Sequence, residues 1–420
     1  MMKSPKRRYL VSLCVAVFLF VAYQVYFTGA YFNYVRYGYT HELYEVLNYI
    51  DNYYVDKVDR RVCLEKILKA GLESCLDKNS HYFTVAEVSG IREQIDGFFG
   101  GVGIEIDKKD DFIQIIAPID DTPAARAGIM TGDMVVAIDG VTTRGMNLAD
   151  FVKKARGAPG TSVTLTVGRG KEKPKDILLV REVIVVTSVK SSLLSSRIGY
   201  IRITQFTRQS AANLAIELRR FGLFKKIGLE KTVDGLIIDL RGNPGGLLDE
   251  VWESLKLLQP SNKKLVITEK GLHVKRVLKE DGAVGYNIND NQDDNIPIVV
   301  LINGGSASAS EIMSGTLKLW GHSALGEESY KKGTVQIILI LLSSGAALNL
   351  TVARYYLGEE ELAVDGIGIS PDYEVKWQKD VSQSEEDFSK EYRKNFGNPA
   401  SDPQLKKGIE VLKERIKSNK

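Results

Sequence analysis

Residues 235–246 read GLIIDLRGNPGG, an apolar strand that enters a glycine loop. A pattern with helical spacing follows over 247–258. Residues 298–302 (IVVLI) repeat this order, because they enter a second glycine turn and then a helical pattern over 310–319. Repeated strand–loop–helix units predict an α/β fold whose sheet has parallel strands and helices on its faces. Such sheets bind ligands at the carboxyl ends of their strands, where both glycine loops would lie.

The limits of this α/β region are expected near 184–376. Residues 335–342 and 348–353, joined by a turn at 343–345, predict a β-hairpin that closes it. The polar tail 377–420 is expected to be helical, with a helix start at Asp402 and Pro403. Its apolar stripe of Leu405, Ile409, Leu412 and Ile416 either packs on the domain or contacts a second subunit in a homodimer.

A different pattern occupies residues 97–183. A glycine cluster (GGVGIEI, 100–106) runs into an alternating strand, and residues 121–129 predict a short helix stopped by glycine. Residues 132–140 predict a turn, a strand and a second turn. A helix over 147–155 and a β-branched strand over 161–167 complete the order.

This order of short elements closely resembles a PDZ domain. In such domains a glycine-rich loop presents backbone N–H groups to the terminal carboxylate of a peptide, which adds as a strand to a sheet edge. The resemblance places that loop at Gly101, Val102, Gly103 and Ile104. Glycine is required there because a Cβ would keep the backbone away from the carboxylate.

The N-terminal segment predicts a membrane anchor. Basic residues at 3, 6, 7 and 8 precede an uncharged stretch over 9–30, which is long enough to span a bilayer. We interpret residues 1–30 as an uncleaved signal anchor in the bacterial inner membrane. Everything after residue 30 would then lie on the periplasmic side. Cleavage after Ala30 is the alternative. Residues 31–96 predict a helical arm.

The composition excludes several other classes of function. The 56 Lys and Arg residues nearly balance 53 Asp and Glu residues, so nothing indicates nucleic-acid binding. No group of cysteines and histidines has metal-ligand spacing, and neither a metal nor another cofactor is expected. Cys63 and Cys75 either pair in an oxidising compartment or stay free thiols.

Several motifs resemble those of the C-terminal processing peptidases, also called tail-specific proteases. They are NGGSASASE (303–311), KGTVQ (332–336), DLRGNPGG (239–246) and VDGIGISPD (364–372). The similarity covers nearly everything after the predicted anchor. It implies a crotonase-like α/β protease core with an inserted PDZ domain.

The resemblance also implies the catalytic residues. The nucleophile would be Ser308, the serine followed by Ala-Ser-Glu, and the base would be Lys332, 24 residues later. Gln336 would orient the lysine amine through its side-chain carbonyl. The oxyanion hole would be formed by the N–H of Ala309 with that of Gly245 or Gly246, and Ser306 and Ser310 would cap or pack.

Physical chemistry agrees with this Ser–Lys dyad. A serine hydroxyl is a poor nucleophile until a base removes its proton. Lysine acts as a base only when it is neutral, so burial must lower its pKa. Lys331 is adjacent, but the register against Gly333 and Gln336 favours Lys332. A Ser–His–Asp triad would need His322, the only histidine near the serine motif, but no Gly-x-Ser-x-Gly motif accompanies it. We interpret His322 as a solvent-facing residue of the turn between a helix and a strand.

We therefore expect a serine endopeptidase that processes or degrades proteins through apolar C-terminal tails. A regulatory partner could switch it on. Two alternatives stay open at this point, namely a PDZ scaffold that binds peptides without cleaving them, and an acyl-CoA enzyme with the same core fold.

Overall fold

The computed structural model describes residues 41–418, apart from 110, 120, 131, 171, 186, 195–196, 225–230, 282–295, 342, 378–390 and 393. The chain divides into two compact units between Tyr82 and Phe83. Residues 41–53 and α2 (Arg60–Cys75) form the described helices of the first unit, and β1 (His81–Phe83) lies at the junction. The predicted anchor over 1–30 lies outside the described residues. Within the part of the chain that is described, no helix is long and apolar enough to cross a membrane.

Cys63 and Cys75 are both free. They lie twelve residues apart on α2, which corresponds to about 18 Å along a helix. A disulfide needs Cα atoms within about 7 Å. The pairing that the sequence left open is therefore wrong.

A two-stranded ribbon leads the chain into and out of the PDZ domain. It consists of β2 (Phe98–Gly101), which follows α3 (Val85–Asp96), and of β9 (Glu182–Val185), with which β2 pairs in antiparallel register. The PDZ elements lie between these strands in sequence: β3 (Ile104–Lys109), β4 (Phe112–Pro118), α4 (Pro123–Arg126), β5 (Met134–Ile138), β6 (Val141–Thr142), α5 (Leu148–Ala155), β7 (Ser162–Gly168) and β8 (Lys175–Val180).

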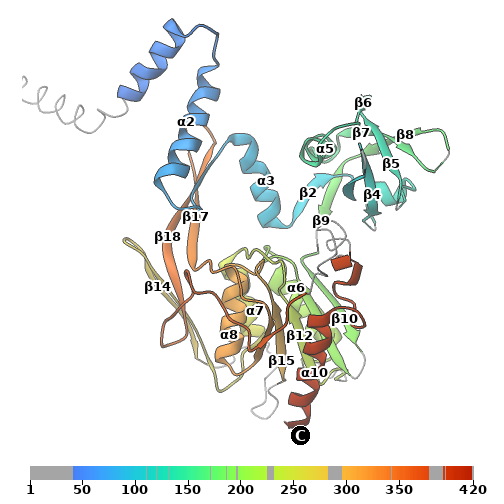
Figure 1. Cartoon of the computed structure of the whole chain (residues 1–420), viewed down its shortest axis with the longest axis vertical. Helices are drawn as coiled ribbons and strands as arrows, with labels where there is room; N and C mark the ends of the chain where they lie inside the picture. The colour runs from blue at the N-terminus through green and yellow to red at the C-terminus, as the bar shows by residue number, and fades with distance from the viewer. Residues whose placement is uncertain are drawn as a thin grey trace, which may run out of the picture. The chain divides into compact units, whose positions relative to one another are not determined.

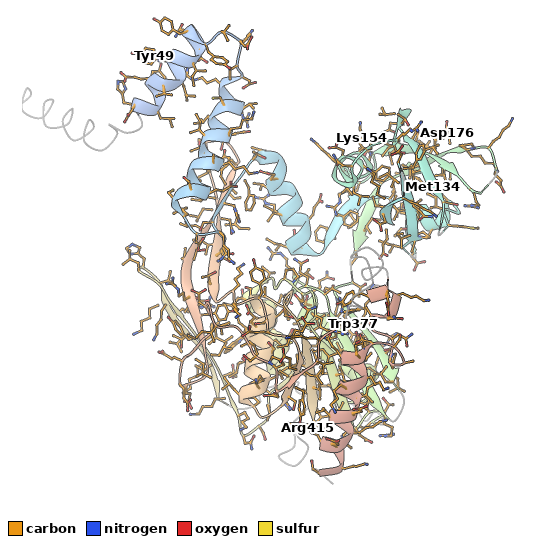
Figure 2. All side chains as sticks on the ribbon, viewed as in Figure 1. Tyr49, Met134, Lys154, Asp176, Trp377 and Arg415 are labelled. Carbon is orange, nitrogen blue, oxygen red and sulfur yellow. The ribbon has the colours of Figure 1, made fainter. Side chains whose placement is uncertain are left out.

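The PDZ sheet has the strand order β3-β4-β5-β7-β8, with antiparallel neighbours. Ile113, Val135 and Leu165 belong to its core, where Phe151 of α5 is fully buried. Asn147 caps α5 by accepting a hydrogen bond from Asp150 N–H at 2.8 Å. The predicted short elements therefore appear in the expected order, together with β4 and β8, which the sequence analysis did not predict (Figure 1). Their buried side chains form a core of their own, and Figure 2 draws the side chains of this domain as sticks.

The central sheet of the α/β region has the order β10-β11-β12-β15-β16-β20. Its strands are β10 (Val189–Leu194), β11 (Ile198–Ile203), β12 (Gly235–Asp239), β15 (Ile298–Ile302), β16 (Ser323–Gly326) and β20 (Tyr373–Glu374). All neighbours are parallel except β10 and β11. The prediction of a parallel sheet with strands at 235 and 298 is confirmed.

Helices cover both faces of this sheet (Figure 1): α6 (Ser210–Arg220), α7 (Leu248–Leu258) and α8 (Ala309–Leu319) on one, α10 (Pro403–Ser418) on the other. Leu236 and Ile238 of β12 join the core cluster that contains α7 and α8, whereas Ile237 joins Leu405 and Leu412 of α10. Burying each such side chain contributes about 1.5–3 kcal/mol. The apolar stripe of the tail thus packs on its own domain.

A second sheet contains the predicted hairpin. The hairpin strands are β17 (Thr334–Ile340) and β18 (Ala347–Leu357), and β18 continues the sheet to β13 (Lys264–Lys270) and then β14 (Lys275–Asp281). The short β19 (Leu362–Ala363) also pairs with β18. The segment that precedes β17, residues 331–333, lies beside the start of α8, because Lys331 N–H and Lys332 N–H donate to the Glu311 carboxylate.

His322 is buried, so its interpretation as a solvent-facing residue is wrong. Its N–H donates to Leu317 O at 3.0 Å, which turns the chain directly from α8 into the fully buried strand β16. Arg415 of α10, labelled in Figure 2, donates to Gly321 O at 2.8 Å and covers the same turn. Burial is the main cause that lowers the pKa of His322 to about 4, and the positive charges of Arg415 and Lys263 lower it further.

This burial predicts a pH-dependent stability. The unfolded chain protonates His322 near pH 6.5, but the folded chain does so only near pH 4. The contribution of His322 to stability is therefore constant well above pH 6.5 and falls by about 3 kcal/mol as the pH drops through 6.5 to 4. Urea unfolding of the His322→Asn variant should show a smaller loss between pH 7 and pH 4.5 than the wild type. An equal loss in both proteins would contradict the assignment.

Candidate active site

Ser308 lies where β15 has ended and α8 begins. Its backbone has φ 54° and ψ −114°, a region that side-chain-bearing residues seldom occupy and that marks a strained, over-determined position. The Ser308 side chain is half-buried. The N-terminus of α8, which carries the positive end of the helix dipole, is oriented to stabilise a negative charge there.

The glycine loop after β12 packs directly against Ser308. A Cβ on Gly245 would lie 2.8 Å from both Ser308 Cβ and Ala307 O, and Gly245 has φ +102°. A Cβ on Gly246 would lie 2.1 Å from Phe206 O. Glycine is therefore required at 245 for the approach to the serine segment, and at 246 for the approach to the segment that contains Phe206.

Two buried serines join the loops. Ser306 Oγ donates to Leu240 O at 2.8 Å, and Ser310 Oγ donates to Asn243 O at 2.9 Å. Ala307 N–H donates to the same Asn243 oxygen at 3.0 Å. Both serines are fully buried, which confirms their interpretation as packing residues.

The backbone donors predicted for an oxyanion hole differ in their hydrogen bonds. Gly245 N–H donates to Asn243 Oδ1 at 2.9 Å. Among the hydrogen bonds of the described residues, none uses the N–H of Ala309 or of Gly246. Of the three predicted donors, the described hydrogen bonds therefore use only the N–H of Gly245.

The two adjacent lysines lie in different environments. Lys331 has φ 74° and is exposed, and its Nζ pairs with Glu328 Oε2 at 2.8 Å. Lys332 is half-buried, and its carbonyl oxygen accepts a hydrogen bond from Tyr355 Oη at 2.7 Å.

On β17, Gln336 Nε2 donates to the hydroxyls of Thr334 (2.8 Å) and Thr351 (3.0 Å). The Gln336 carbonyl oxygen is then the end of the amide that is left to accept a hydrogen bond from an amine.

Glu311 links the serine segment to the lysine segment. Its fully buried carboxylate accepts hydrogen bonds from Ser308 N–H (2.8 Å) and Lys332 N–H (2.9 Å) on one oxygen. The other oxygen accepts from Lys331 N–H (2.7 Å) and from the Ser329 hydroxyl. One side chain therefore fixes the main chain at both predicted catalytic residues.

Tyr355 of β18 makes a second link between the same residues. Its hydroxyl contacts Ser308 O at 3.1 Å and Lys332 O at 2.7 Å. Burial raises the pKa of Tyr355 well above its ordinary value, so the hydroxyl keeps its proton and can donate. Sequence reasoning missed both Glu311 and Tyr355. Glu311 stood inside the serine motif, but Tyr355, 47 residues after Ser308, carried no signal.

The PDZ domain contains a small apolar cavity of about 80 Å³. The predicted carboxylate loop lines one side and α5 the other, and the lining residues are Phe99, Gly101, Val102, Gly103, Ile104, Ile106, Phe151, Val152, Ala155 and Arg156. Gly103 has φ +78°, and a Cβ there would lie 2.3 Å from Thr122. All four residues predicted to bind a peptide terminus therefore line this cavity.

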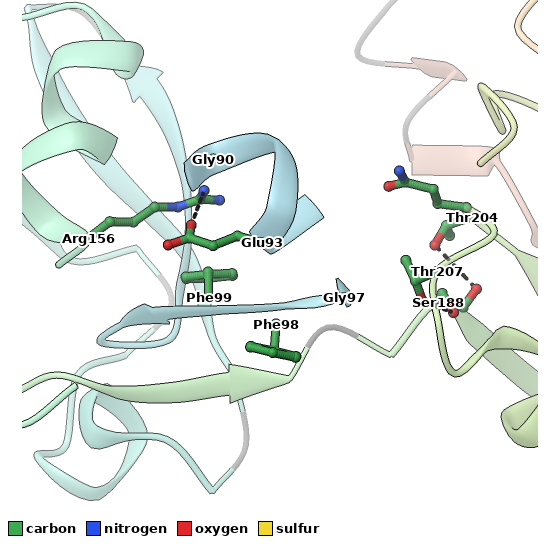
Figure 3. Close-up of a pocket in the computed structure, with 10 residues that line it drawn as sticks. Gly90, Glu93, Gly97, Phe98, Phe99, Arg156, Ser188, Thr204 and Thr207 are labelled. Atoms are coloured by element: carbon green, nitrogen blue, oxygen red, sulfur yellow. Dashed lines mark hydrogen bonds and ion pairs between the residues drawn. The ribbon is translucent and has the colours of Figure 1, made fainter. Parts of the chain in front are cut away.

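A second cavity, of about 190 Å³, lies beside the ribbon strand β2 (Figure 3). Arg156 lines it as well, with its guanidinium 4.2 Å from the Phe99 ring and 3.3 Å from Glu93 of α3. On its other side the Thr207 and Ser188 hydroxyls are 3.3 Å apart. Arg156 thus lines both the peptide cavity and this second cavity, where it pairs with Glu93 of α3.

Comparisons with known proteins show the family to which the chain belongs. The sequence profile of peptidase family S41 matches residues 197–375, and that of the PDZ domain matches 114–169. A carboxy-terminal-processing protease of Bartonella bacilliformis is 37% identical over 334 residues, covering 79% of this chain and 74% of the relative. A probable CtpA-like serine protease of Staphylococcus aureus is 32% identical, covering 80% of this chain and 64% of that protein.

A solved structure, a photosystem II D1 C-terminal processing protease, is 24% identical, with a TM-score of 0.43, and covers 79% of this chain and 92% of its own. The sequence relatives, with the α/β core and the PDZ domain, define a PDZ-containing serine protease. The chain belongs to peptidase family S41, among the carboxy-terminal-processing proteases.

The Glu311 contacts generate a prediction. In Glu311→Gln an amide NH₂ replaces one carboxylate oxygen, so two of the four donors lose their acceptor. Each buried donor left unpaired costs about 1–3 kcal/mol. We expect the free energy of unfolding in urea to fall by about 2–6 kcal/mol.

Glu328→Gln is the matched control, because Glu328 is exposed and pairs with Lys331 on the same segment. An exposed pair contributes less than about 1 kcal/mol. Equal losses in the two variants would refute the linking role of Glu311.

Proposed function

We propose that this protein is a serine endopeptidase in which Ser308 is the nucleophile and Lys332 the general base. The observation that carries the proposal is the double link between the two residues. Glu311 accepts a hydrogen bond from both of their N–H groups, and the Tyr355 hydroxyl contacts both of their carbonyl oxygens. A fixed main chain at both residues favours a productive approach of their side chains.

The reaction proceeds through an acyl-enzyme. The neutral amine of Lys332 removes the proton of Ser308 Oγ, which attacks the scissile carbonyl carbon. The N–H groups of Ala309 and Gly246 stabilise the negative oxygen of the tetrahedral intermediate. The Lys332 ammonium then protonates the leaving amine, and a water activated by Lys332 hydrolyses the ester.

The surroundings of the two lysines support Lys332 rather than Lys331 as the base. Lys331 is exposed, and its Nζ is engaged in an ion pair with Glu328. Lys332 is half-buried, and Gln336 offers its carbonyl oxygen four residues later. This arrangement suits an amine that must be neutral and oriented.

The PDZ cavity supports recognition of substrate proteins by their C-terminal tails. Apolar side chains such as Val102, Ile104 and Phe151 dominate its lining, and its volume of about 80 Å³ suits one small apolar side chain. The PDZ mode pairs a peptide strand with the sheet edge and binds its carboxylate to loop N–H groups. The substrate class is therefore proteins that end in a small apolar residue.

Hydrolysis of an unfolded protein with an apolar C-terminus tests the proposal. Ser308→Ala and Lys332→Ala should each lower kcat by at least about 10³-fold, since nucleophile and base act together. Lys331→Ala and His322→Ala should keep activity within a few-fold of the wild type. Replacing the last substrate residue by Asp should raise KM.

Two results would contradict the proposal. Activity in Lys332→Ala but not in Lys331→Ala would reverse the lysine assignment. A wild type that binds tail peptides but cleaves none of the substrates would favour the peptide-binding scaffold.

We also propose that residues 1–30 tether the protease to the membrane. The observation is the uncharged stretch over 9–30 behind four basic residues. Each charge placed at the middle of such a helix costs about 2.5–3.5 kcal/mol on insertion. Alkaline extraction should leave the wild type in the membrane fraction and release a Val15→Arg, Leu19→Arg variant, whereas Lys3→Gln should behave like the wild type. A released wild-type protein that lacks residues 1–30 would instead establish cleavage.

A further inference from the structure

Arg241 is fully buried immediately before the glycine loop that approaches Ser308. Its guanidinium contacts two carboxylates, Asp239 at 2.6 Å and Asp402 at 2.8 Å. Nη1 also donates to Gln404 Oε1 at 2.8 Å, and the Phe396 ring lies 4.1 Å from Cζ. Three of these partners belong to the C-terminal segment 396–405, which lies outside the 197–375 range matched by the family profile.

The same contacts extend to the main chain at the start of the loop. Asp239 Oδ1 accepts hydrogen bonds from both the N–H and the Nε of Arg241, each at 3.0 Å. Arg202 Nη2 donates to Arg241 O at 3.2 Å. The following N–H, of Gly242, donates to Asn303 Oδ1 at 2.8 Å. The side chain of Arg241 therefore fixes the direction in which the chain enters Gly242–Gly246.

The charges in this cluster are balanced only when the C-terminal segment is present. Arg202 and Arg241 supply two positive charges, and Asp239 and Asp402 supply two negative ones. Asp239, Arg241 and Asp402 are fully buried. Loss of the Asp402 charge would leave one excess positive charge where water cannot solvate it, and the guanidinium would move to reach solvent or new partners.

We propose that Asp402 is a positioning residue for the oxyanion loop, acting through Arg241, with Gln404 in a supporting role. The inference rests on the proposed function, because that function assigns Gly246 of this loop as an oxyanion donor. The C-terminal helix is then part of the catalytic apparatus and not only a cover for the sheet. The Asp402 carboxylate both pairs with Arg241 and caps α10, because its Oδ1 accepts hydrogen bonds from Gln404 N–H and Leu405 N–H, both at 3.0 Å.

The test uses Asp402→Asn, which keeps an oxygen to cap α10 but removes the charge. Cleavage of a fluorogenic peptide with an apolar tail should show kcat reduced about 10- to 100-fold, with KM changed less than twofold. Binding of a peptidyl boronic acid, whose serine adduct places a negative oxygen in the oxyanion hole, should weaken in the same proportion. Tail-peptide binding by the PDZ domain should be unchanged.

Glu410→Gln is the matched control, since Glu410 is exposed on the same helix and pairs only with Lys407 among the contacts of the described residues. It should keep kcat and boronate affinity at wild-type values. If Asp402→Asn does not fold, Gln404→Met takes its place, because it removes a neutral acceptor of Arg241. It should produce a smaller loss of the same kind.

Different results would overturn different claims. An Asp402→Asn variant with a lower melting temperature but unchanged kcat and boronate affinity well below it would show a structural role alone, and the inference would fall. Reduced kcat with unchanged boronate affinity would also overturn it. A wild type that neither cleaves the peptide nor binds the boronate would overturn the proposed function itself.

Discussion

The close approach of two loops at the carboxyl edge of the central sheet is the constraint on which the site depends. The loops follow β12 and β15, which are neighbouring parallel strands, so the topology alone brings Gly245 and Ser308 together. The missing Cβ at Gly245 makes the distance achievable, and the hydroxyls of Ser306 and Ser310 hold the loops in register. The strained backbone of Ser308 is maintained because the surrounding contacts over-determine it.

Sequence patterns predicted those parts of the molecule that local chemistry determines. The buried strands at 235 and 298 were predicted from continuous apolar runs, and the PDZ elements from alternation and turn residues. The glycines and small residues of the loops at 242–246 and 303–308 were likewise recognisable from short motifs. These features are readable because each depends on residues within about a dozen positions of one another.

The parts that sequence reasoning missed depend on contacts between distant segments. The hydroxyl of Tyr355 reaches two carbonyl oxygens only because β18 pairs with β17, which follows Lys332. His322 looked like an exposed turn residue, but α10, almost a hundred residues later, covers the turn. No pattern along the chain encodes burial that a remote helix supplies, so these residues could be placed only in three dimensions.

The charge of Glu311 poses a physical problem for a lysine base, because a nearby carboxylate favours an ammonium. The geometry offers an answer. Four donors share the charge between both carboxylate oxygens, and three of them are main-chain N–H groups that are part of the fold. The first turn of α8 adds its dipole, since Glu311 lies there. A carboxylate that accepts hydrogen bonds from these fixed donors does not depend on the Lys332 ammonium as a counter-ion, which is compatible with the base role proposed for Lys332.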